Sequence, residues 1–398
     1  MAPLPAADPL DQSRPQTLPQ RSRLTPMPKA GTKFECRRTD LLAACQLANL
    51  VVLASQHQPV LRNIKLDADE TRCRIEATNQ EYGIRLDVTG VTVSTGGRLL
   101  IPADRLTAIL RETSDETVTI EATDRTTLVR TGQSEFELNT EDPATYPEVP
   151  TPRPKQHHAI IAGQLRNAVH RTRFAAAKES DRYPLTGTLW ELDESEIRLV
   201  ATDGKRLAFA RCDAKAHGGN EPPGPPHIVP AKAMQLLERL LTDPEEVVKV
   251  TLNENEAFFR VGTAVLHTRL IEGRYPSYRD IFPKTKAVEI PLPVGPFHSV
   301  IRQAAILADS DSLGVEFSFT TRTLTLHTRS PDAGRSKVEL TVEFSGEPIT
   351  VALEPRFVAD VLRTLSDDQT LTLELTDSKK AVVFRLGTAY AYLIMPLC

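Results

Sequence analysis

The sequence predicts an α+β protein made of three tandem copies of one unit, each with two helices and many short strands. Two sets of repeated motifs carry this prediction. The first set consists of strand–glycine turn–strand segments around Gly132, Gly262 and Gly387. The second set consists of proline-containing helix starts at 101–106, 229–234 and 353–358. Spacings within the sets run from 124 to 130 residues, too long for a solenoid repeat, so we expect three domains in a row.

Each unit is expected to contain an earlier and a later helix. The earlier helices are predicted at 41–52, 165–176 and 297–308. Each later helix, opened by its proline, should end in an acidic turn, at 114–116, 243–245 and 366–368. In the third unit Phe357, Val361 and Leu365 recur at four-residue steps. That spacing predicts one apolar helix face directed toward a sheet.

Proline-rich stretches at 143–154 and 283–296 mark the boundaries between units. The expected domains are 33–152, 156–286 and 287–398. We interpret 214–226, rich in Gly and Pro, as a flexible insertion inside the second domain, because the later helix of that domain follows it. Residues 1–32 are rich in Pro, Gln and Ser without a signal-peptide apolar run, which predicts a disordered N-terminal extension.

Composition excludes several classes of protein. Hydrophobic residues make up 40% and charged residues 25% of the chain, as in a globular protein, and no apolar run is long enough to span a bilayer. The 5 cysteines are scattered without a Cys-x-x-Cys pair, which argues against a disulfide framework and favours the reducing cytoplasm. No metal-ligand spacing and no cofactor motif is present, so we expect neither a metal nor a cofactor.

Basic side chains recur on the predicted helices although the net charge of the chain is −4. These side chains are Arg105, Arg166, Arg173, Lys232, Arg239, Arg302, Arg356 and Arg363. Taken singly, each is expected to be part of an ordinary solvated helix face. Their recurrence in all three units favours a basic surface made by helices around a common hole. Such a surface would hold duplex DNA through its phosphates, without reading its sequence.

Three short segments carry a family resemblance. They are Thr202-Asp203-Gly204-Lys205-Arg206-Leu207, Glu272-Gly273-Arg274-Tyr275-Pro276-Ser277-Tyr278 and Tyr392-Leu393-Ile394-Met395-Pro396-Leu397. In this order they resemble the bacterial replicative sliding clamp, the beta subunit of DNA polymerase III, and the resemblance covers residues 33 to 398. It implies three DNA-clamp domains per chain and a head-to-tail homodimer that forms a ring around DNA. It also implies a processivity factor with no catalysis of its own.

The resemblance further implies a cleft that captures short peptides from the replicative DNA polymerase, other polymerases and repair proteins, and a clamp loader that opens the ring. The residues that match the cleft of the family are Leu185, Thr202, Gly204, Lys205, Arg206, Leu207, Pro276, Ile281, Leu393, Met395, Pro396 and Leu397. Apolar members of this set would form a socket with polar edges. Met395 would adapt the socket to different peptides.

For the dimer interface, the resemblance implies that Phe136 and Leu138 of one chain face Ile306 and Leu307 of its partner. The alternation around Phe136 suits an edge strand that pairs with another chain. The alternative, nearly as well supported, is that Phe136 fills the core of its own domain. Tyr183 matches one of a pair of tyrosines that contact DNA in the family.

Departures from the family pattern leave other functions open. The loop Ser55-Gln56-His57-Gln58 lacks an Arg that often reaches DNA in the family. This absence keeps a clamp-like paralogue, a protein-interaction hub that does not encircle DNA, as an alternative. An enzyme acting on phosphates or sugars through Asp203 is the least favoured alternative. No Gly-rich phosphate loop or Ser/His/Asp constellation accompanies Asp203, and a turn explains that residue.

Overall fold

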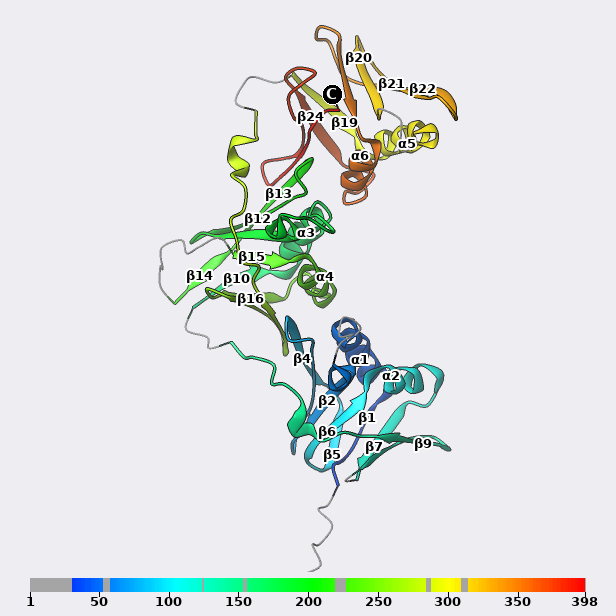
Figure 1. The fold of residues 1–398 in the computed structure, drawn as a ribbon, viewed down its shortest axis with the longest axis vertical. Helices are drawn as coiled ribbons and strands as arrows, with labels where there is room; N and C mark the ends of the chain where they lie inside the picture. The colour runs from blue at the N-terminus through cyan, green and yellow to red at the C-terminus, as the bar shows by residue number, and fades with distance from the viewer. Residues whose placement is uncertain are drawn as a thin grey trace, which may run out of the picture.

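The computed structural model describes residues 31–52, 58–123, 125–152, 156–218, 227–283, 288–308 and 314–397. The predicted N-terminal extension lies outside these residues except for its last two positions, and most of the loop 55–58 lies outside them as well. The described chain forms three units along an arc, with the helices on the concave side (Figure 1). All three units mix helices with antiparallel sheets, so the predicted α+β class and the threefold repeat are confirmed.

The first unit supplies one complete sheet and part of a second. Its helices are α1 (Arg38–Val52), α2 (Ala103–Glu112), η1 (Pro59–Arg62) and η2 (Pro143–Thr145). Its strands are β1 (Lys33–Arg37), β2 (Asn63–Ala68), β3 (Cys73–Thr78), β4 (Tyr82–Val88), β5 (Val91–Thr95), β6 (Gly97–Pro102), β7 (Thr117–Ala122), β8 (Thr126–Thr131) and β9 (Ser134–Asn139). The complete sheet has the order β5-β1-β7-β8-β9, which leaves β9 at an edge.

The second unit contributes to two sheets that it shares with its neighbours. Its helices are α3 (Ala162–Arg173), α4 (Ala231–Leu240), η3 (Tyr183–Thr186) and η4 (Tyr278–Asp280). Its strands are β10 (His157–Ile161), β11 (Gly187–Leu192), β12 (Glu196–Thr202), β13 (Arg206–Asp213), β14 (Lys215–His217), β15 (His227–Pro230), β16 (Val247–Leu252), β17 (Glu256–Val261) and β18 (Ala264–Arg269).

The third unit repeats the pattern. Its helices are α5 (Val294–Ala304), α6 (Pro355–Leu362) and η5 (Ala305–Leu307). Its strands are β19 (Val288–Pro293), β20 (Val315–Thr320), β21 (Thr323–Ser330), β22 (Gly334–Thr341), β23 (Ile349–Leu353), β24 (Thr370–Leu375), β25 (Val382–Leu386) and β26 (Tyr390–Ile394). A four-stranded sheet in the order β22-β21-β20-β23 leaves β22 at an edge.

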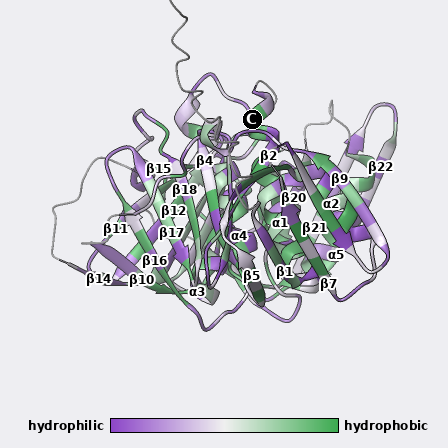
Figure 2. Cartoon of the chain, turned by 90° about the horizontal axis from the view of Figure 1, so that it is seen from below, coloured by the Kyte–Doolittle hydropathy of each residue, from purple (hydrophilic) through white to green (hydrophobic). Residues whose placement is uncertain are grey.

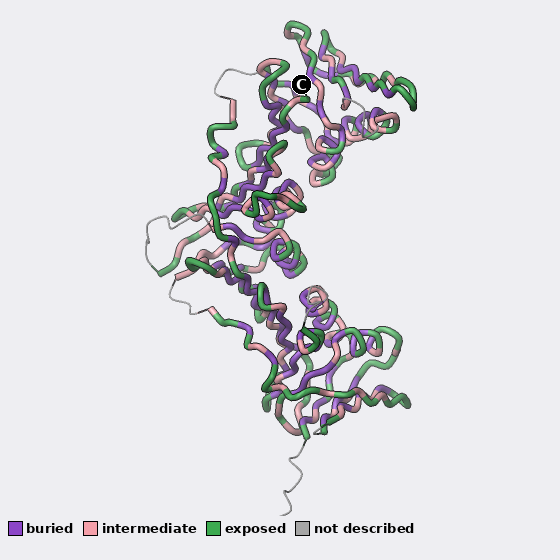
Figure 3. The backbone as a smooth tube through the Cα atoms, in the orientation of Figure 1, coloured by how far each residue is buried: buried purple, intermediate pink, exposed green. Residues whose placement is uncertain are grey.

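Two sheets run without interruption from one unit into the next. Strand β18 pairs antiparallel with β4, which joins the second unit to the first in a nine-stranded sheet. Strand β13 pairs antiparallel with β26, which joins the second unit to the third in an eight-stranded sheet. These junction strands are largely buried (Figure 3). Backbone hydrogen bonds together with buried apolar area therefore set the arc.

Apolar residues fill the space between helices and sheets, and the connecting loops are hydrophilic (Figure 2). Leu106 and Leu110 lie one turn apart on α2 and are fully buried on the face that meets the sheet. Val361 of α6 is fully buried in the same way. Phe357 and Leu365, predicted on the same face as Val361, are only partly buried. The reason for Phe357 is that its ring also covers Arg206 of the second unit.

The repeated turns and helix starts are as predicted. Gly132, Gly262 and Gly387 have φ of +55°, +53° and +57°, a left-handed conformation that glycine adopts without steric cost. Helices α2 and α4 begin directly after Pro102 and Pro230, and α6 has Pro355 at its first position.

Two predictions of local structure need correction. The earlier helices α1, α3 and α5 each begin three residues before the predicted start. Each follows a strand directly, and the apolar spacing marks only the first large buried side chain: Leu41, Leu165 or Phe297. The stretch 214–226 is also not wholly a flexible insertion. Its first residues form β14, which pairs with β10, while 219–226 lies outside the described residues.

No helix of the described chain is both long enough and apolar enough to cross a membrane. The described residues also contain no group of three or more His, Cys, Asp or Glu side chains placed to hold a metal ion.

Candidate binding cleft and helix faces

The turn between β12 and β13 forms one wall of the candidate cleft. Gly204 has φ of +90°, and no atom lies within 4 Å of where a side chain would begin, so conformation rather than space requires glycine. Asp203 accepts hydrogen bonds through Oδ1 from the backbone N–H groups of Lys205 (3.0 Å) and Arg206 (3.1 Å). The Gly204 N–H donates to Thr202 Oγ1 (3.1 Å). Asp203 Oδ2 accepts a further hydrogen bond from Arg206 Nε (2.9 Å). Both carboxylate oxygens of Asp203 therefore stabilise the turn.

A hollow of about 210 Å³ opens beside this turn, between the second and third units. Its lining residues are Arg182, Leu185, Thr202, Gly204, Lys205, Arg206, Leu207, Pro276, Ile281, Leu393 and Met395. Ten of the twelve cleft residues predicted from the sequence thus lie together, although they come from η3, the β12–β13 turn, the 276–281 segment and the chain end.

Two predicted cleft residues, Pro396 and Leu397, are not among those that line the hollow. The Leu397 N–H donates to the Ala352 carbonyl (2.9 Å), which draws the end of the chain along β23 of the third unit. Arg182, in contrast, lines the hollow and was not predicted there. The only sequence signal for Arg182 is its position two residues before Pro184, where it directly precedes η3.

The floor of the hollow is apolar and buried, and its rim is exposed and partly charged. Leu185, Leu207 and Leu393 are buried, whereas Met395 is 44% exposed and Ile281 is 38% exposed. Arg182 and Lys205 are exposed at the rim. This arrangement suits a short peptide that buries apolar side chains and leaves polar groups at the edge.

Arg206 lines the hollow as predicted, and its charge is bound within the protein. Its guanidinium donates to Asp203, to Asp360 Oδ2 (2.7 Å) and to the Phe174 carbonyl (3.1 Å). The ring centroid of Phe357 lies 4.4 Å from its Cζ, a cation–π contact. The charge of Arg206 is therefore neutralised within the protein, and the side chain braces the wall of the cleft.

Most of the basic side chains predicted to face DNA are exposed on the helices of the concave side (Figure 1). The exposed members are Arg105, Arg166, Lys232, Arg239, Arg302, Arg356 and Arg363. Arg363 also donates to Asp360 Oδ1 (2.9 Å), and Tyr183, on η3, is 62% exposed.

Arg173 differs from the other predicted basic residues. Its guanidinium is hydrogen-bonded to Glu238 of α4, which also accepts from His170 Nδ1 (2.7 Å). Burial alone would raise the pKa of Glu238, but the hydrogen bonds from His170 and Arg173 lower it further than burial raises it. Much of the charge of Arg173 is thus used to hold α3 against α4.

The four residues predicted at a dimer interface lie on two separate surfaces of the chain. Phe136 and Leu138 are half-buried on the edge strand β9 and pack against the core of their own unit. Ile306 is 77% exposed on η5, and Leu307 is half-buried beside it. Among the large hydrophobic side chains of the described residues, Ile306 is the most exposed.

Comparisons with known proteins are consistent along the whole described chain. Models of the DNA polymerase III beta subunit match in order: the N-terminal domain over residues 32–150, the central domain over 159–277 and the C-terminal domain over 279–397. A beta sliding clamp of Vibrio cholerae is 27% identical over 367 residues, covering 92% of this chain and 99% of its own length. One of Chlamydia muridarum is 26% identical, covering 92% and 98%. The crystal structure of a sliding clamp from Pseudomonas aeruginosa bound to griselimycin gives a TM-score of 0.85 at 26% identity, covering 92% and 100%.

Proposed function

The chain belongs to the family of the DNA polymerase III beta subunit, and we propose that it is a DNA sliding clamp, a ring-shaped homodimer that encircles duplex DNA. It tethers the replicative DNA polymerase to its template and has no catalytic activity of its own. No cofactor is needed, because a ring holds DNA by its topology.

The observation that carries this proposal is the arc of three family domains with every long helix on its concave side. The exposed cations of those helices face the space that DNA would occupy, in a chain whose net charge is −4. Contacts of this kind are made to phosphates and tolerate any sequence, so they permit sliding. We assign the clamp domains to 33–152, 156–286 and 287–398.

Closure of the ring is supported by two edge strands. Strand β9 of the first unit and β22 of the third unit each lie at the edge of a sheet and alternate in burial. An edge strand is a template for pairing with another chain. Phe136 and Leu138 on β9 of one chain, set against Ile306 and Leu307 of the partner, would bury the exposed Ile306 and repeat the sheet continuity seen inside the chain.

The hollow beside the β12–β13 turn is the proposed docking site for short peptides of the replicative polymerase, other polymerases, repair proteins and the clamp loader. Its support is the apolar floor of Leu185, Leu207 and Leu393 next to the exposed, adaptable Met395. A protein that acts on chromosomal DNA is located in the cytoplasm. The four described cysteines, all free and buried, suit that reducing compartment.

The proposal is tested by retention on nicked circular DNA, with clamp loader and ATP, before and after the circle is linearised. A clamp stays on circles and leaves linear DNA through its ends. Equal retention on both forms would indicate ordinary binding and reject encirclement. No retention by purified dimer with a competent loader would favour a hub paralogue that docks proteins without encircling DNA.

A further inference from the structure

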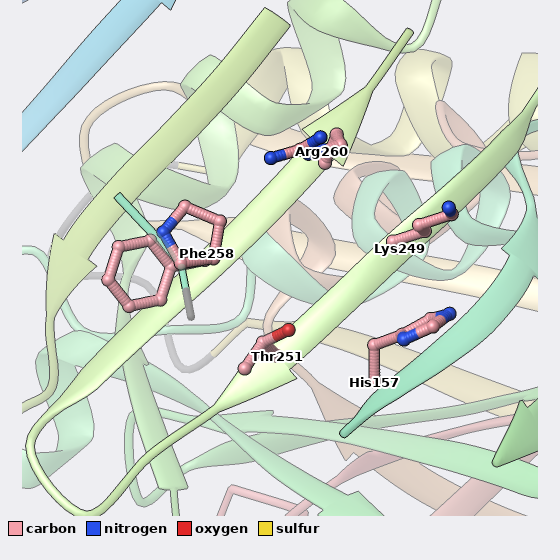
Figure 4. A pocket seen from close by; sticks show the side chains of 6 residues that line it. His157, Lys249, Thr251, Phe258 and Arg260 are labelled. Carbon is pink, nitrogen blue, oxygen red and sulfur yellow. The ribbon is translucent and has the colours of Figure 1, made fainter. Parts of the chain in front are cut away.

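A second hollow lies on the outer face of the second unit, on the side of its sheet opposite the helices (Figure 4). We call it the outer hollow, and its lining residues are Pro152, His157, Lys249, Thr251, Phe258 and Arg260. The next residues along β16 and β17, Val248, Val250 and Phe259, belong to the buried core that also includes residues of α3 and α4. Because side chains alternate along a strand, the lining residues point the other way, out of the ring.

Two cations flank the outer hollow from neighbouring strands. Lys249 of β16 and Arg260 of β17 are directly opposite each other in the strand register, and both are exposed. Among the described residues, neither has a carboxylate within ion-pair distance. Like charges directly opposite each other destabilise a strand pair, so this arrangement costs stability in the free protein.

Elsewhere in the sheets several cations face an acid. Such cross-strand pairs, each closed by an ion pair, are Lys33 with Glu121, Lys65 with Glu76, Arg74 with Asp87, Asp67 with Arg98 and Arg130 with Glu135. Arg198 and Arg211 also face each other, but both contact Glu196. Arg329 and Arg335 form a further like pair at the end of a hairpin. What sets Lys249 and Arg260 apart is the hollow they flank.

The interior of the outer hollow is apolar. Phe258 is 3% exposed, and Pro152 is the other apolar residue that lines the hollow. The volume of the hollow is about 100 Å³, whereas a cavity of roughly 10–15 Å³ is enough for one water molecule. The hollow therefore has room for an apolar side chain. His157 borders the hollow, and its ring stacks on that of His217 with the ring centroids 4.9 Å apart.

We propose that the outer hollow binds an acidic peptide segment of a partner protein, which inserts one apolar side chain over Phe258 and sets its carboxylates against Lys249 and Arg260. The ligand would relieve the repulsion between the two cations. A nucleic acid strand fits less well, because sequence-independent strand binding uses successive exposed aromatic platforms, and here one buried ring is flanked by two cations. The outer hollow shares no residue with the cleft at Met395, and the inference does not depend on the proposed ring.

The probe is a fluorescein-labelled peptide, Glu-Asp-Ile-Asp-Glu with blocked ends, titrated into the full chain at low salt and followed by polarisation. We expect Lys249→Gln/Arg260→Gln to weaken binding by about tenfold or more, since two charge pairs are lost. The double variant removes a repulsion, so its thermal stability should not fall. Arg98→Gln, which removes an exposed cation from the first unit, should leave the affinity within about twofold. The His157 imidazole NMR signals should shift on titration in the parent protein alone.

Three results would overturn the proposal. The first is equal binding by the parent and the double variant. The second is binding that is lost in the cleft variant Met395→Glu but kept in Lys249→Gln/Arg260→Gln, which would place the peptide in the cleft. The third is a probe with Gly in place of Ile that binds as well, or displacement by oligo-dT at lower concentration than the unlabelled peptide. Either form of the third result would indicate a general anion surface instead of a peptide site.

Discussion

The guanidinium group of Arg206 contacts three parts of this molecule. Arg206, whose side chain is 11% exposed, connects the β12–β13 turn of the second unit to the end of α3 and to α6 of the third unit. Asp360 of α6 also accepts from Arg363 on the concave side, so a cleft residue and a residue proposed to face DNA share one carboxylate. The cleft wall therefore depends on the packing of α6 against the second unit.

Replacing Arg206 by Gln should lower the free energy of unfolding by about 3 kcal/mol, because Asp203 and Asp360 would lose the partner that neutralises them. Binding of a clamp-binding peptide to the cleft should weaken as the turn loosens. Urea denaturation and peptide titration measure the two effects. The exposed neighbour Lys205 provides the control: Lys205→Gln should change the free energy of unfolding by less than about 0.5 kcal/mol. Equal free energies of unfolding for both variants would show that Arg206 does not stabilise the wall of the cleft.

Glu238 makes the stability of the second unit depend on pH. Its pKa is raised by burial but lowered further by His170 and Arg173, and the net result is a folded-state pKa below its unfolded value. A carboxyl of this kind stabilises the fold above the unfolded pKa, and that stabilisation is lost as pH falls through the folded pKa.

Glu238→Gln should therefore lower the free energy of unfolding by about 1 kcal/mol at pH 7, an amount limited by the partial exposure of its partners. The difference from the parent protein should shrink as pH falls below roughly 4.5, where the carboxyl of the unfolded chain becomes protonated. Urea denaturation from pH 7 to pH 3 measures this. A constant difference across the range would mean that the loss comes from packing and not from charge.

At the scale of elements, the exposed ends of the arc carry the contacts proposed to close the ring. Ile306→Asp should leave the stability of a single chain unchanged within about 0.5 kcal/mol, because the side chain is already 77% exposed. It should weaken dimerisation by tenfold or more, since a charge would then be buried in an apolar interface. Sedimentation velocity across a concentration series measures this. Ser318→Asp, a half-exposed change within the same unit, should not alter the dimer.

The sequence predicts elements well where periodicity and turn chemistry act locally. Repeated glycines with positive φ and prolines at helix starts mark the units, and the three cleft segments converge although the chain separates Thr202 from Met395 by more than one unit. What it could not predict depends on contacts between units. The apolar spacing of Phe357 does not indicate that its ring covers Arg206, and the basic spacing of Arg173 does not reveal Glu238 on the neighbouring helix.

At the scale of the whole molecule, two properties of a ring can be separated by experiment. We expect attraction to DNA to come from the exposed cations on the concave helices and to fall with added salt more steeply as more phosphates are contacted. Retention on a closed circle comes from topology, which charge does not affect. The acidic net charge of the chain, −4, keeps the attraction local to the concave side.

The variant Arg166→Gln/Lys232→Gln/Arg239→Gln removes three exposed cations from α3 and α4 of each chain. Loading at raised salt should fall, and the dependence of DNA binding on salt should become shallower, because fewer counterions are released. The half-life on closed circles, once loaded, should stay within about twofold of the parent value. The control variant Arg72→Gln/Arg98→Gln removes exposed cations from the β2–β3 turn and from β6, outside both proposed peptide sites, and should change neither quantity. If the half-life on circles instead fell together with affinity in the first variant, retention would be electrostatic, and the two ends of the arc would not form a closed ring.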